Sequence, residues 1–496
     1  MLSTLPPPLK ARTRALNRRR VAKEGRGYVL CWLQQALRAT DNPALDVAIT
    51  VANRLGLPVV VHHGIREDYP YASDRLHRFL IGASRTLEKG CEARGIRCVN
   101  LLLRPAKFDR SAVYRLAADA ALTVTDDQPL FVARRQADRF AAKADGAVWA
   151  VDANHMVPLG TLAEGITSTK GFRAAHKPLR DRDWAVPGDV APEQPPHDGP
   201  LAYESDRLAA RRAGTLDRWL AECRIDHSLP PGAFEASAAA LEARMAALEQ
   251  VVLPAYRWRR NNAADPAGAS RLSPYLHFGM IGPREVARRV AASDAPAGCK
   301  WKFLDEMLTW REWFAYLAWH RETPTAWSIL PERARATLEA HSGDPRDHLP
   351  GLAALMRGET GDETWDAAQK GFVCDGYMHN NLRMFWGKKL IEWTASPKEA
   401  WSTALWLNDR LSYDGRDPAT YGNMEWVFGR GRPGYREIPV YGRVSPKSDR
   451  AMRRRPGMAD WLATEAAREA PAASVPNAVP DYAGEAPPYF PMLFEG

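Results

Sequence analysis

Tyr28-Val29-Leu30-Cys31-Trp32-Leu33 is an uninterrupted apolar run near the start of this 496-residue chain. A strand that is apolar on both faces needs cover on both faces, as in a parallel sheet between helix layers. Similar runs follow at 58–63, 97–103, 121–125 and 147–151, separated by helix-like stretches such as 41–55 and 73–94. The alternation predicts a doubly wound, Rossmann-like α/β domain over residues 26–160. No Gly-x-Gly-x-x-Gly follows the first run, so the fingerprint of dinucleotide binding is missing.

The chain changes character after a linker. Residues 161–202 are assigned to this linker because Ala185–Pro200 is rich in proline and glycine. From 203 to 465 the strand signal almost disappears, and the second domain is predicted to be mostly α. Its clearest helices are expected at Phe234–Val252, Trp301–His320 and Tyr377–Trp393. Residues 466–496 are rich in proline and alanine and are expected to form a poorly ordered tail.

Charge gives the first indication of a partner. Lys and Arg number 68 against 59 Asp and Glu, a net charge of +9. The excess gathers in runs at Lys10–Arg26, Arg257–Arg260, Arg430–Arg436 and Lys447–Arg455. Such clusters suit DNA phosphates, although a solvated basic surface is the simpler alternative. Residues 1–25 are predicted to be a basic N-terminal arm, either flexible or part of that surface.

Composition argues against several other classes of protein. A hydrophobic share of 45% and a charged share of 26% are ordinary for a globular protein, and no apolar run is long enough to cross a bilayer. The N-terminus lacks the apolar segment of a secretory signal, so we expect a cytoplasmic protein, associated with the nucleoid through DNA and without a membrane partner. A monomer is expected. The six cysteines have no metal-binding spacing, and no metal site is predicted.

Tryptophan is concentrated in the helical part of the chain. Trp386 and Trp393 lie one heptad apart, so a helix would place both indoles on one face. Trp365 lies just upstream, and eleven of the 17 tryptophans fall between Trp301 and Trp426. Because an indole is readily oxidised, a buried row of indoles can carry an electron hole from the surface to a redox cofactor. The simpler interpretation is that these side chains fill a helical core.

A second motif is Ser270-Arg271-Leu272-Ser273-Pro274-Tyr275-Leu276-His277-Phe278-Gly279, which turns into a helix. Ser273 as the N-cap, followed by Pro274, would leave backbone N–H groups free to hold an anion such as a pyrophosphate. Taken alone, Ser-x-x-Ser-Pro more often marks an ordinary capped helix.

The whole string resembles the FAD-binding stretch of DNA photolyases and cryptochromes. Further stretches are similar to the class II cyclobutane pyrimidine dimer photolyases: Arg38–Leu45, Val151–Pro158, Trp365–Gln369, Met378–His379, Arg383–Met384, Lys388–Thr394, Leu407–Asp409 and Asp414–Pro418. The resemblance covers roughly residues 28–443. It implies a light-driven lyase that acts on pyrimidine dimers in double-stranded DNA, with reduced FAD bound non-covalently in the helical domain. Whether the α/β domain carries an antenna chromophore as well, and which one, stays open.

The resemblance also implies roles for residues around the flavin. Asn408 matches the asparagine that faces flavin N5, although a helix C-cap is the simpler role for it. Arg383 resembles the arginine beside the isoalloxazine, with Asp414 as its partner; a structural ion pair is the alternative. The other matched cofactor positions are Tyr256, Ser270, Arg271, Leu272, Ser273 and Asp417. Trp386, Trp365 and Trp393 match the photoreduction triad, in this order from the flavin to the surface.

A second set of matched residues belongs to the DNA lesion. Glu306 matches the lesion-facing carboxylic acid and is expected to be buried, with a raised pKa that lets it donate a hydrogen bond. Glu312 nearby is predicted to be an exposed helix carboxylate. The residues matched to the flipped dimer are Trp310, Trp426 and Met384, and Arg430 and Arg432 are assigned to DNA.

The chain departs from the class II pattern in places. Ala419-Thr420 replaces the usual Asn-Gly, Tyr377 replaces a lysine, and Val444-Ser445-Pro446 stands where Ile-Arg-Tyr is usual. The loop after Trp426 is shortened to Gly429–Tyr435, which puts contacts inside the opened DNA in doubt.

Three other functions are weighed against photolyase activity. A cryptochrome-like photoreceptor would share the flavin and the tryptophans but need no dimer pocket. A flavin-free DNA-binding protein would be colourless and could not be reconstituted with FAD. A (6-4) photolyase is disfavoured because its pair of histidines is not found at the matching positions.

Overall fold

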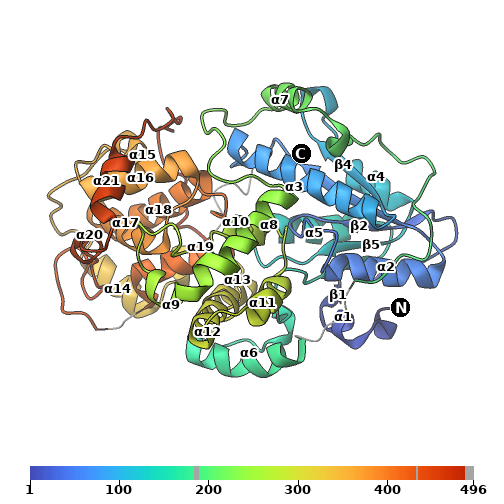
Figure 1. Ribbon diagram of the computed structural model, residues 1–496, viewed down its shortest axis with the longest axis horizontal. Helices are drawn as coiled ribbons and strands as arrows, with labels where there is room; N and C mark the ends of the chain where they lie inside the picture. Colours follow the sequence, from blue (N-terminus) through green and yellow to red (C-terminus); the bar gives the residue numbers. More distant parts are fainter. Residues whose placement is uncertain (184–188, 432–433, 486–496) are drawn as a thin grey trace.

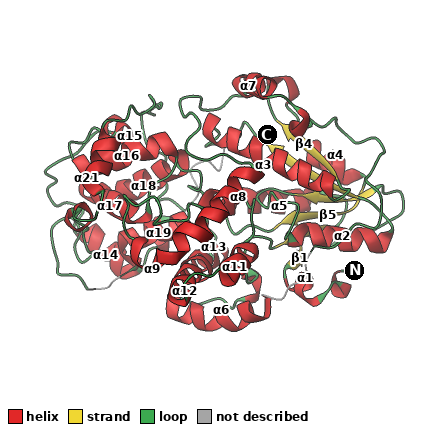
Figure 2. Ribbon diagram, in the orientation of Figure 1, coloured by secondary structure: helices red, strands yellow, loops and turns green. Residues whose placement is uncertain are grey.

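The computed structural model describes residues 1–183, 189–431 and 434–485. Its sheet contains six strands, β1 (Thr13–Ala15), β2 (Tyr28–Trp32), β3 (Val59–Ile65), β4 (Arg97–Leu102), β5 (Ala120–Asp126) and β6 (Val148–Val151). They are arranged in the order β1-β6-β5-β2-β3-β4, and every pair is parallel except β1 with β6. Figure 2 shows the strands together on one side of the molecule. The predicted parallel sheet is therefore confirmed, and its order reverses between β5 and β2, as in doubly wound folds.

Helices cover both faces of this sheet because the buried strand residues alternate between the faces. Val29 and Cys31 pack in one cluster with α2 (Pro43–Leu55) and α3 (Asp74–Ala93). Tyr28 and Leu30 pack in another with α4 (Ala112–Ala118) and α5 (Phe131–Lys143). The apolar run at 28–32 thus supplies both layers of the core, as its continuous hydrophobicity predicts.

Residues 1–25 differ from the predicted basic arm. α1 (Pro7–Ala11) leads into β1, which adds an antiparallel strand to the sheet edge beside β6. Arg12 is buried between them, and its guanidinium donates to the carbonyls of Asp152, His155 and Met156. An arginine that is buried against backbone carbonyls and an arginine on a solvated surface look the same in the sequence. Composition therefore could not distinguish a folded edge from a flexible basic arm.

The predicted linker and tail also contain ordered structure. α6 (Thr169–Asp183) lies within 161–202, and its Phe172 packs against Tyr316 of the helical domain, with 5.7 Å between the ring centroids. In the tail, Tyr482 is buried and its hydroxyl donates to Asp409 at 2.9 Å. One aromatic side chain is enough to hold a proline-rich segment against a core, which composition alone does not reveal.

The second domain is helical, as predicted, and lies beside the sheet domain (Figure 1). Its helices include α8 (Ala238–Ala247), α9 (Tyr256–Arg259), α10 (Ser273–His277), α11 (Pro283–Ala292), α12 (Ala297–Asp305), the π-helix η7 (Glu306–Arg311), α13 (Glu312–Trp319), α14 (Glu332–Ala340), α15 (Leu352–Arg357), α16 (Glu363–Asp375), α17 (Asn380–Glu392), α18 (Pro397–Leu411), α19 (Pro418–Glu425), the π-helix η9 (Trp426–Arg430), α20 (Arg450–Arg453) and α21 (Met458–Ala466). Within the described ranges, no helix combines the length and apolarity needed to cross a membrane.

The two domains share one continuous core, which runs from Val29 of β2 through Phe278 to Trp386. Gly279 lies where the domains meet, with φ +62°, and a Cβ there would approach the Gln35 carbonyl oxygen to 2.2 Å. Only glycine tolerates both the left-handed backbone and this close approach. The tight contact fixes the helical domain against the sheet.

Candidate active site

Asn408 is fully buried on α18, one turn before the helix ends. Its side-chain amide donates to the Ala404 carbonyl at 2.7 Å, while its Oδ1 has no hydrogen-bond partner among the described residues. A buried acceptor without a donor is costly in a folded protein, so such an atom points to a missing ligand group. The hydrogen-bonding edge of a flavin would supply that donor.

Arg383 provides a buried cation on the neighbouring helix α17. Its Nη2 lies 3.9 Å from Asp414 Oδ1, longer than a direct hydrogen bond, and its Nε is buried without a partner among the described residues. Asp414 accepts a short hydrogen bond from the Ser412 hydroxyl. The guanidinium is therefore only partly neutralised by the protein, and the residues present suit an anionic flavin.

The Ser270–Gly279 motif differs in detail from the expected capped helix. Leu272, not Ser273, occupies the N-cap position of α10, and no side chain caps the helix. Arg271 has a φ of +53°, a left-handed conformation that reverses the chain just before the helix. The backbone N–H groups of the first turn are thus left without a side-chain acceptor, as an anion site requires.

Two further expected cofactor residues have protein partners. Tyr256 on α9 is buried and packs edge-on against Phe303 of α12 at 5.3 Å. Asp417 caps α19 by accepting from the Ala419 amide and lies 3.2 Å from His277 Nδ1. Burial alone would raise the pKa of Asp417, but Arg311 and His277 hold it well below its ordinary value.

The three tryptophans of the expected triad form one contact chain. Trp386 and Trp365 are stacked, with ring centroids 6.0 Å apart and planes 7° apart. Trp365 then meets Trp393 at 5.4 Å in an edge-on arrangement. Trp365 and Trp386 are fully buried, whereas Trp393 is slightly exposed. The contacts therefore run 386–365–393, and the direction from flavin to surface stays a prediction.

The lesion-side residues gather around η7. Trp310 meets Trp426 of η9 edge-on, with ring centroids 5.2 Å apart. Glu306 is not buried as expected: its side chain is 28% exposed and forms ion pairs with Arg260 at 2.9 Å and Lys302 at 2.6 Å. Lys302 lies one helical turn before Glu306, whereas Arg260, the C-cap of α9, approaches from another part of the chain.

The remaining lesion and DNA residues are placed differently. Met384 is half-buried on α17. Arg430 at the end of η9 is paired with Glu425 and donates to the Ile329 carbonyl at 2.9 Å, so it lies against the protein. Arg432 lies outside the described residues.

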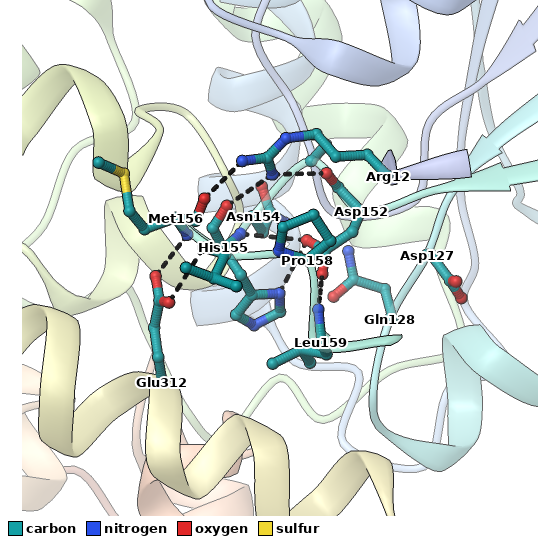
Figure 3. Close-up of polar contacts among 12 residues, drawn as sticks. Arg12, Asp127, Gln128, Asp152, Asn154, His155, Met156, Pro158, Leu159 and Glu312 are labelled. Atoms are coloured by element: carbon teal, nitrogen blue, oxygen red, sulfur yellow. Dashed lines mark hydrogen bonds and ion pairs between the residues drawn. The ribbon is translucent and has the colours of Figure 1, made fainter. Parts of the chain in front are cut away.

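Glu312 contradicts its predicted exposure. It is completely buried and accepts hydrogen bonds from the Met156 and Val157 amides of the α/β domain (Figure 3). Its carboxylate also contacts His176 Nε2 at 2.6 Å. Burial would raise the pKa of Glu312, but the contact with His176 and the Met156 amide holds it below its ordinary value. Because Glu312 directly follows η7, this network fixes the lesion-side helix to the other domain.

The same network contains residues that sequence reasoning missed. Asp152 accepts from His155 Nδ1 at 2.9 Å and from the Leu159 amide at 3.0 Å, while Arg12 binds the adjoining carbonyls (Figure 3). The similarity of Val151–Pro158 to the class II photolyases was a signal for Asp152 and His155. No such signal pointed to Arg12 or His176, because both lie outside the stretches that resemble the class II photolyases.

A separate cavity of about 350 Å³ opens at the carboxyl ends of β2 and β3. Its lining includes Trp32, His62, His63, Arg66, Tyr114 and Lys143, together with His277 and Phe278 of the helical domain. In doubly wound sheets, ligands bind outside the carboxyl ends of strands where the strand order reverses. This cavity lies at that position.

Comparison with known proteins agrees with the architecture and motifs. Residues 29–195 match the DNA photolyase family model. Deoxyribodipyrimidine photo-lyases from Methanothermobacter thermautotrophicus and Oryza sativa are each 31% identical to the chain; the alignments cover 86% and 89% of it, and 92% and 88% of those proteins.

Two solved structures share the fold. A class III photolyase from Agrobacterium tumefaciens aligns with a TM-score of 0.63 at 20% identity, covering 88% of this chain and 86% of its own. A cryptochrome from Synechocystis aligns with a TM-score of 0.65 at 17% identity, covering 89% of each chain. Identity over nearly the full length of the first relatives is decisive: the chain belongs to the deoxyribodipyrimidine photo-lyase family of DNA photolyases.

Proposed function

We propose that this protein repairs cyclobutane pyrimidine dimers in DNA with light. The observation that carries the proposal is the convergence of a buried unpaired amide oxygen on Asn408, a buried cation on Arg383 and a tryptophan chain that begins on the same helix as Arg383. Reduced FAD, when bound, supplies the photoexcited electron that splits the cyclobutane ring and recovers it afterwards.

Asn408 and Arg383 hold the cofactor in its active charge state. The unpaired Oδ1 of Asn408 would accept a hydrogen bond from a bound reduced flavin, and the Arg383 guanidinium would offset a negative charge on it. The Ser270–Ser273 turn presents uncapped amides to the diphosphate. Tyr256, Asp414 and Asp417 complete the walls of this site.

Trp386, Trp365 and Trp393 keep the enzyme in the reduced state by passing electrons inward. The indole N–H of Trp386 donates to Gln369 Oε1 at 2.8 Å, and that of Trp365 donates to the Trp386 carbonyl at 3.1 Å. Neither neutral acceptor is basic, so the first two indoles retain their protons while the hole moves outward to Trp393.

Glu306, Trp310, Met384 and Trp426 receive the flipped dimer. The edge-on pair of Trp310 and Trp426 offers two flat apolar faces at about a right angle, with 86° between the rings. Glu306 donates to the lesion only if it carries a proton, so approach of the dimer must displace Arg260 and Lys302 from it.

The cavity at the carboxyl ends of β2 and β3 is proposed to hold a second, light-harvesting chromophore. It is bounded by aromatic rings and by the cations Arg66 and Lys143, which suit a planar anionic molecule. An archaeal photolyase from Sulfolobus tokodaii, with a TM-score of 0.59 to this chain at 16% identity, was solved with two FAD molecules, which implicated a novel light-harvesting cofactor in that protein.

Repair of an oligonucleotide with one thymine dimer by the photoreduced protein, in blue light and in darkness, tests the proposal. Loss of the dimer only in light is expected. A protein that binds flavin and photoreduces it, yet repairs nothing in light, would be a photoreceptor. A colourless protein that cannot be reconstituted with FAD would rule out both.

A further inference from the structure

Two tryptophans are strongly exposed on the helical domain. Trp258 on α9 is 64% exposed and Trp301 on α12 is 63% exposed, more than any other large hydrophobic residue that the structure describes as exposed. Tryptophan is largely buried in most folded proteins and is enriched at binding surfaces. These indoles contribute little to the core, so their exposure on the surface points to a binding partner.

The two helices that carry the exposed indoles lie side by side, because α9 packs against α12. On the inner side, Tyr256 contacts Phe303 at 5.3 Å. On the outer side, Arg257 Nη1 lies 3.5 Å from the position that a Cβ on Gly298 would occupy, one helical turn before Trp301. Figure 1 shows α9 and α12 close together in the lower part of the helical domain. We call Arg257, Trp258 and Trp301 the outer tryptophan surface.

Charge identifies the kind of partner. Arg257 takes part in no ion pair within the part of the chain that is described, and it stands directly beside Trp258. Arg260 and Lys302 add positive charge next to the surface. Indoles beside cations suit unpaired nucleic acid, because bases stack on aromatic rings and phosphates pair with positive charge.

The location of the outer tryptophan surface beside Glu306 indicates where unpaired bases would come from. Trp301 lies five residues before Glu306, and Arg260 and Lys302 link the outer tryptophan surface directly to the Glu306 carboxylate. Rotating a dimer out of the duplex leaves unpaired nucleotides next to the pocket.

We propose that Trp258 and Trp301 form a stacking platform for unpaired DNA bases beside the lesion, with Arg257 on the phosphate backbone. This inference rests on the proposed function for the location of the lesion. It adds a binding surface outside the dimer pocket, which holds opened DNA and does not itself take part in electron transfer.

Equilibrium binding in darkness tests the platform apart from repair. Fluorescence anisotropy would be measured with labelled oligothymidylate, a duplex with one thymine dimer and the undamaged duplex. Trp258→Ala and Trp301→Ala are each expected to weaken binding of oligothymidylate and of the damaged duplex by about fivefold or more. Trp258→Phe and Trp301→Phe should retain most of the affinity. Arg257→Gln should lower the salt dependence of binding by about one phosphate contact.

Phe108→Ala provides a matched control, because Phe108 is 44% exposed beneath the Arg110 guanidinium on the α/β domain. It should bind all three DNAs like the unaltered protein. Unchanged affinity of both tryptophan-to-alanine variants would overturn the platform, even if light-driven repair were demonstrated. Loss of self-association in sedimentation, with DNA binding intact, would overturn it in favour of a second copy of the chain. Loss of binding without repair activity would leave the platform standing and refute the proposed function.

Discussion

Two buried polar clusters in this protein are built in opposite ways. Around Glu312, both carboxylate oxygens are paired, with the Met156 amide, the Val157 amide and His176. Around Asn408 and Arg383, an amide oxygen and a guanidinium nitrogen are buried without partners among the described residues. A fully satisfied network stabilises the fold, whereas unsatisfied buried atoms cost free energy that a ligand can recover. The first cluster joins the two domains, and the second is the one that we propose to hold the cofactor.

The largest effect is expected at the electron path. Trp386→Phe should block photoreduction of oxidised flavin, because phenylalanine is much harder to oxidise, yet leave repair by chemically reduced enzyme largely intact. Flavin absorbance under illumination and dimer repair report the two activities separately. Trp401→Phe is the control, since Trp401 is equally buried but forms no ring contact with Trp365, Trp386 or Trp393. Equal loss of both activities in Trp386→Phe would refute its place in the chain.

The next largest effect is expected when the hydrogen-bonded cluster around Glu312 is disrupted. Glu312→Ala removes the acceptor of two amides and leaves His176 without its carboxylate, so the free energy of unfolding should fall by about 3–5 kcal/mol. Urea unfolding measures this change. Glu332→Ala, on an exposed side chain of α14, should stay within about 0.5 kcal/mol. A Glu312→Ala protein of unaltered stability would show that the network does not join the domains.

The stability of the apoprotein should depend little on the cluster around Asn408 and Arg383. Asn408→Ala removes an unpaired oxygen along with one hydrogen bond to Ala404, so the apoprotein should change in stability by no more than about 1 kcal/mol. Reduced flavin bound to this variant should reoxidise faster in air than in the unaltered protein. A strongly destabilised apoprotein with unchanged reoxidation would make Asn408 a structural residue.

A smaller effect is expected on the DNA side. Glu306→Ala should lower the yield of repair per absorbed photon while FAD stays bound, because the lesion loses its hydrogen-bond donor. Quantum yield and flavin absorbance are measured on one sample. The loss should be partial, since Trp310 and Trp426 still hold the dimer. An unchanged yield would remove Glu306 from the proposed mechanism.

The smallest effect concerns acid stability. The pKa of Glu312 is lowered in the folded protein, so its contribution to stability is present above the unfolded pKa, about 4.3, and is lost as pH falls through the folded pKa. Glu312→Gln should therefore lose less stability on acidification, by up to about 1.4 kcal/mol per pH unit below pH 4. Urea unfolding of both proteins at several acidic pH values measures this difference. If the free energies of unfolding of the two proteins fell in parallel with pH, Glu312 would not titrate in this way.

Patterns that repeat along the chain were predictable. The apolar runs gave the five parallel strands because strands covered on both faces must be apolar throughout. The heptad spacing of Trp386 and Trp393 placed their indoles on one side of α17, where both now contact Trp365. The resemblance named Asn408 and Arg383, which the structure places on adjacent buried helices.

The exposure of single charged residues was not predictable. Glu306 and Glu312 lie six positions apart, yet the first is partly exposed and the second is fully buried. Their difference arises from Met156 and His176, which approach only Glu312 from other parts of the chain. The same reason explains why Arg12 lies in a sheet edge and not in an arm.

The sequence by itself determined the fold class, the family and the identity of the tryptophan chain, since each depends on local periodicity or on contiguous motifs. Only the tertiary structure decided which polar atoms are satisfied, which carboxylates are buried, and that Trp258 and Trp301 are exposed to solvent. Burial and hydrogen-bond pairing are set by contacts between segments far apart in the chain, and no local pattern encodes them.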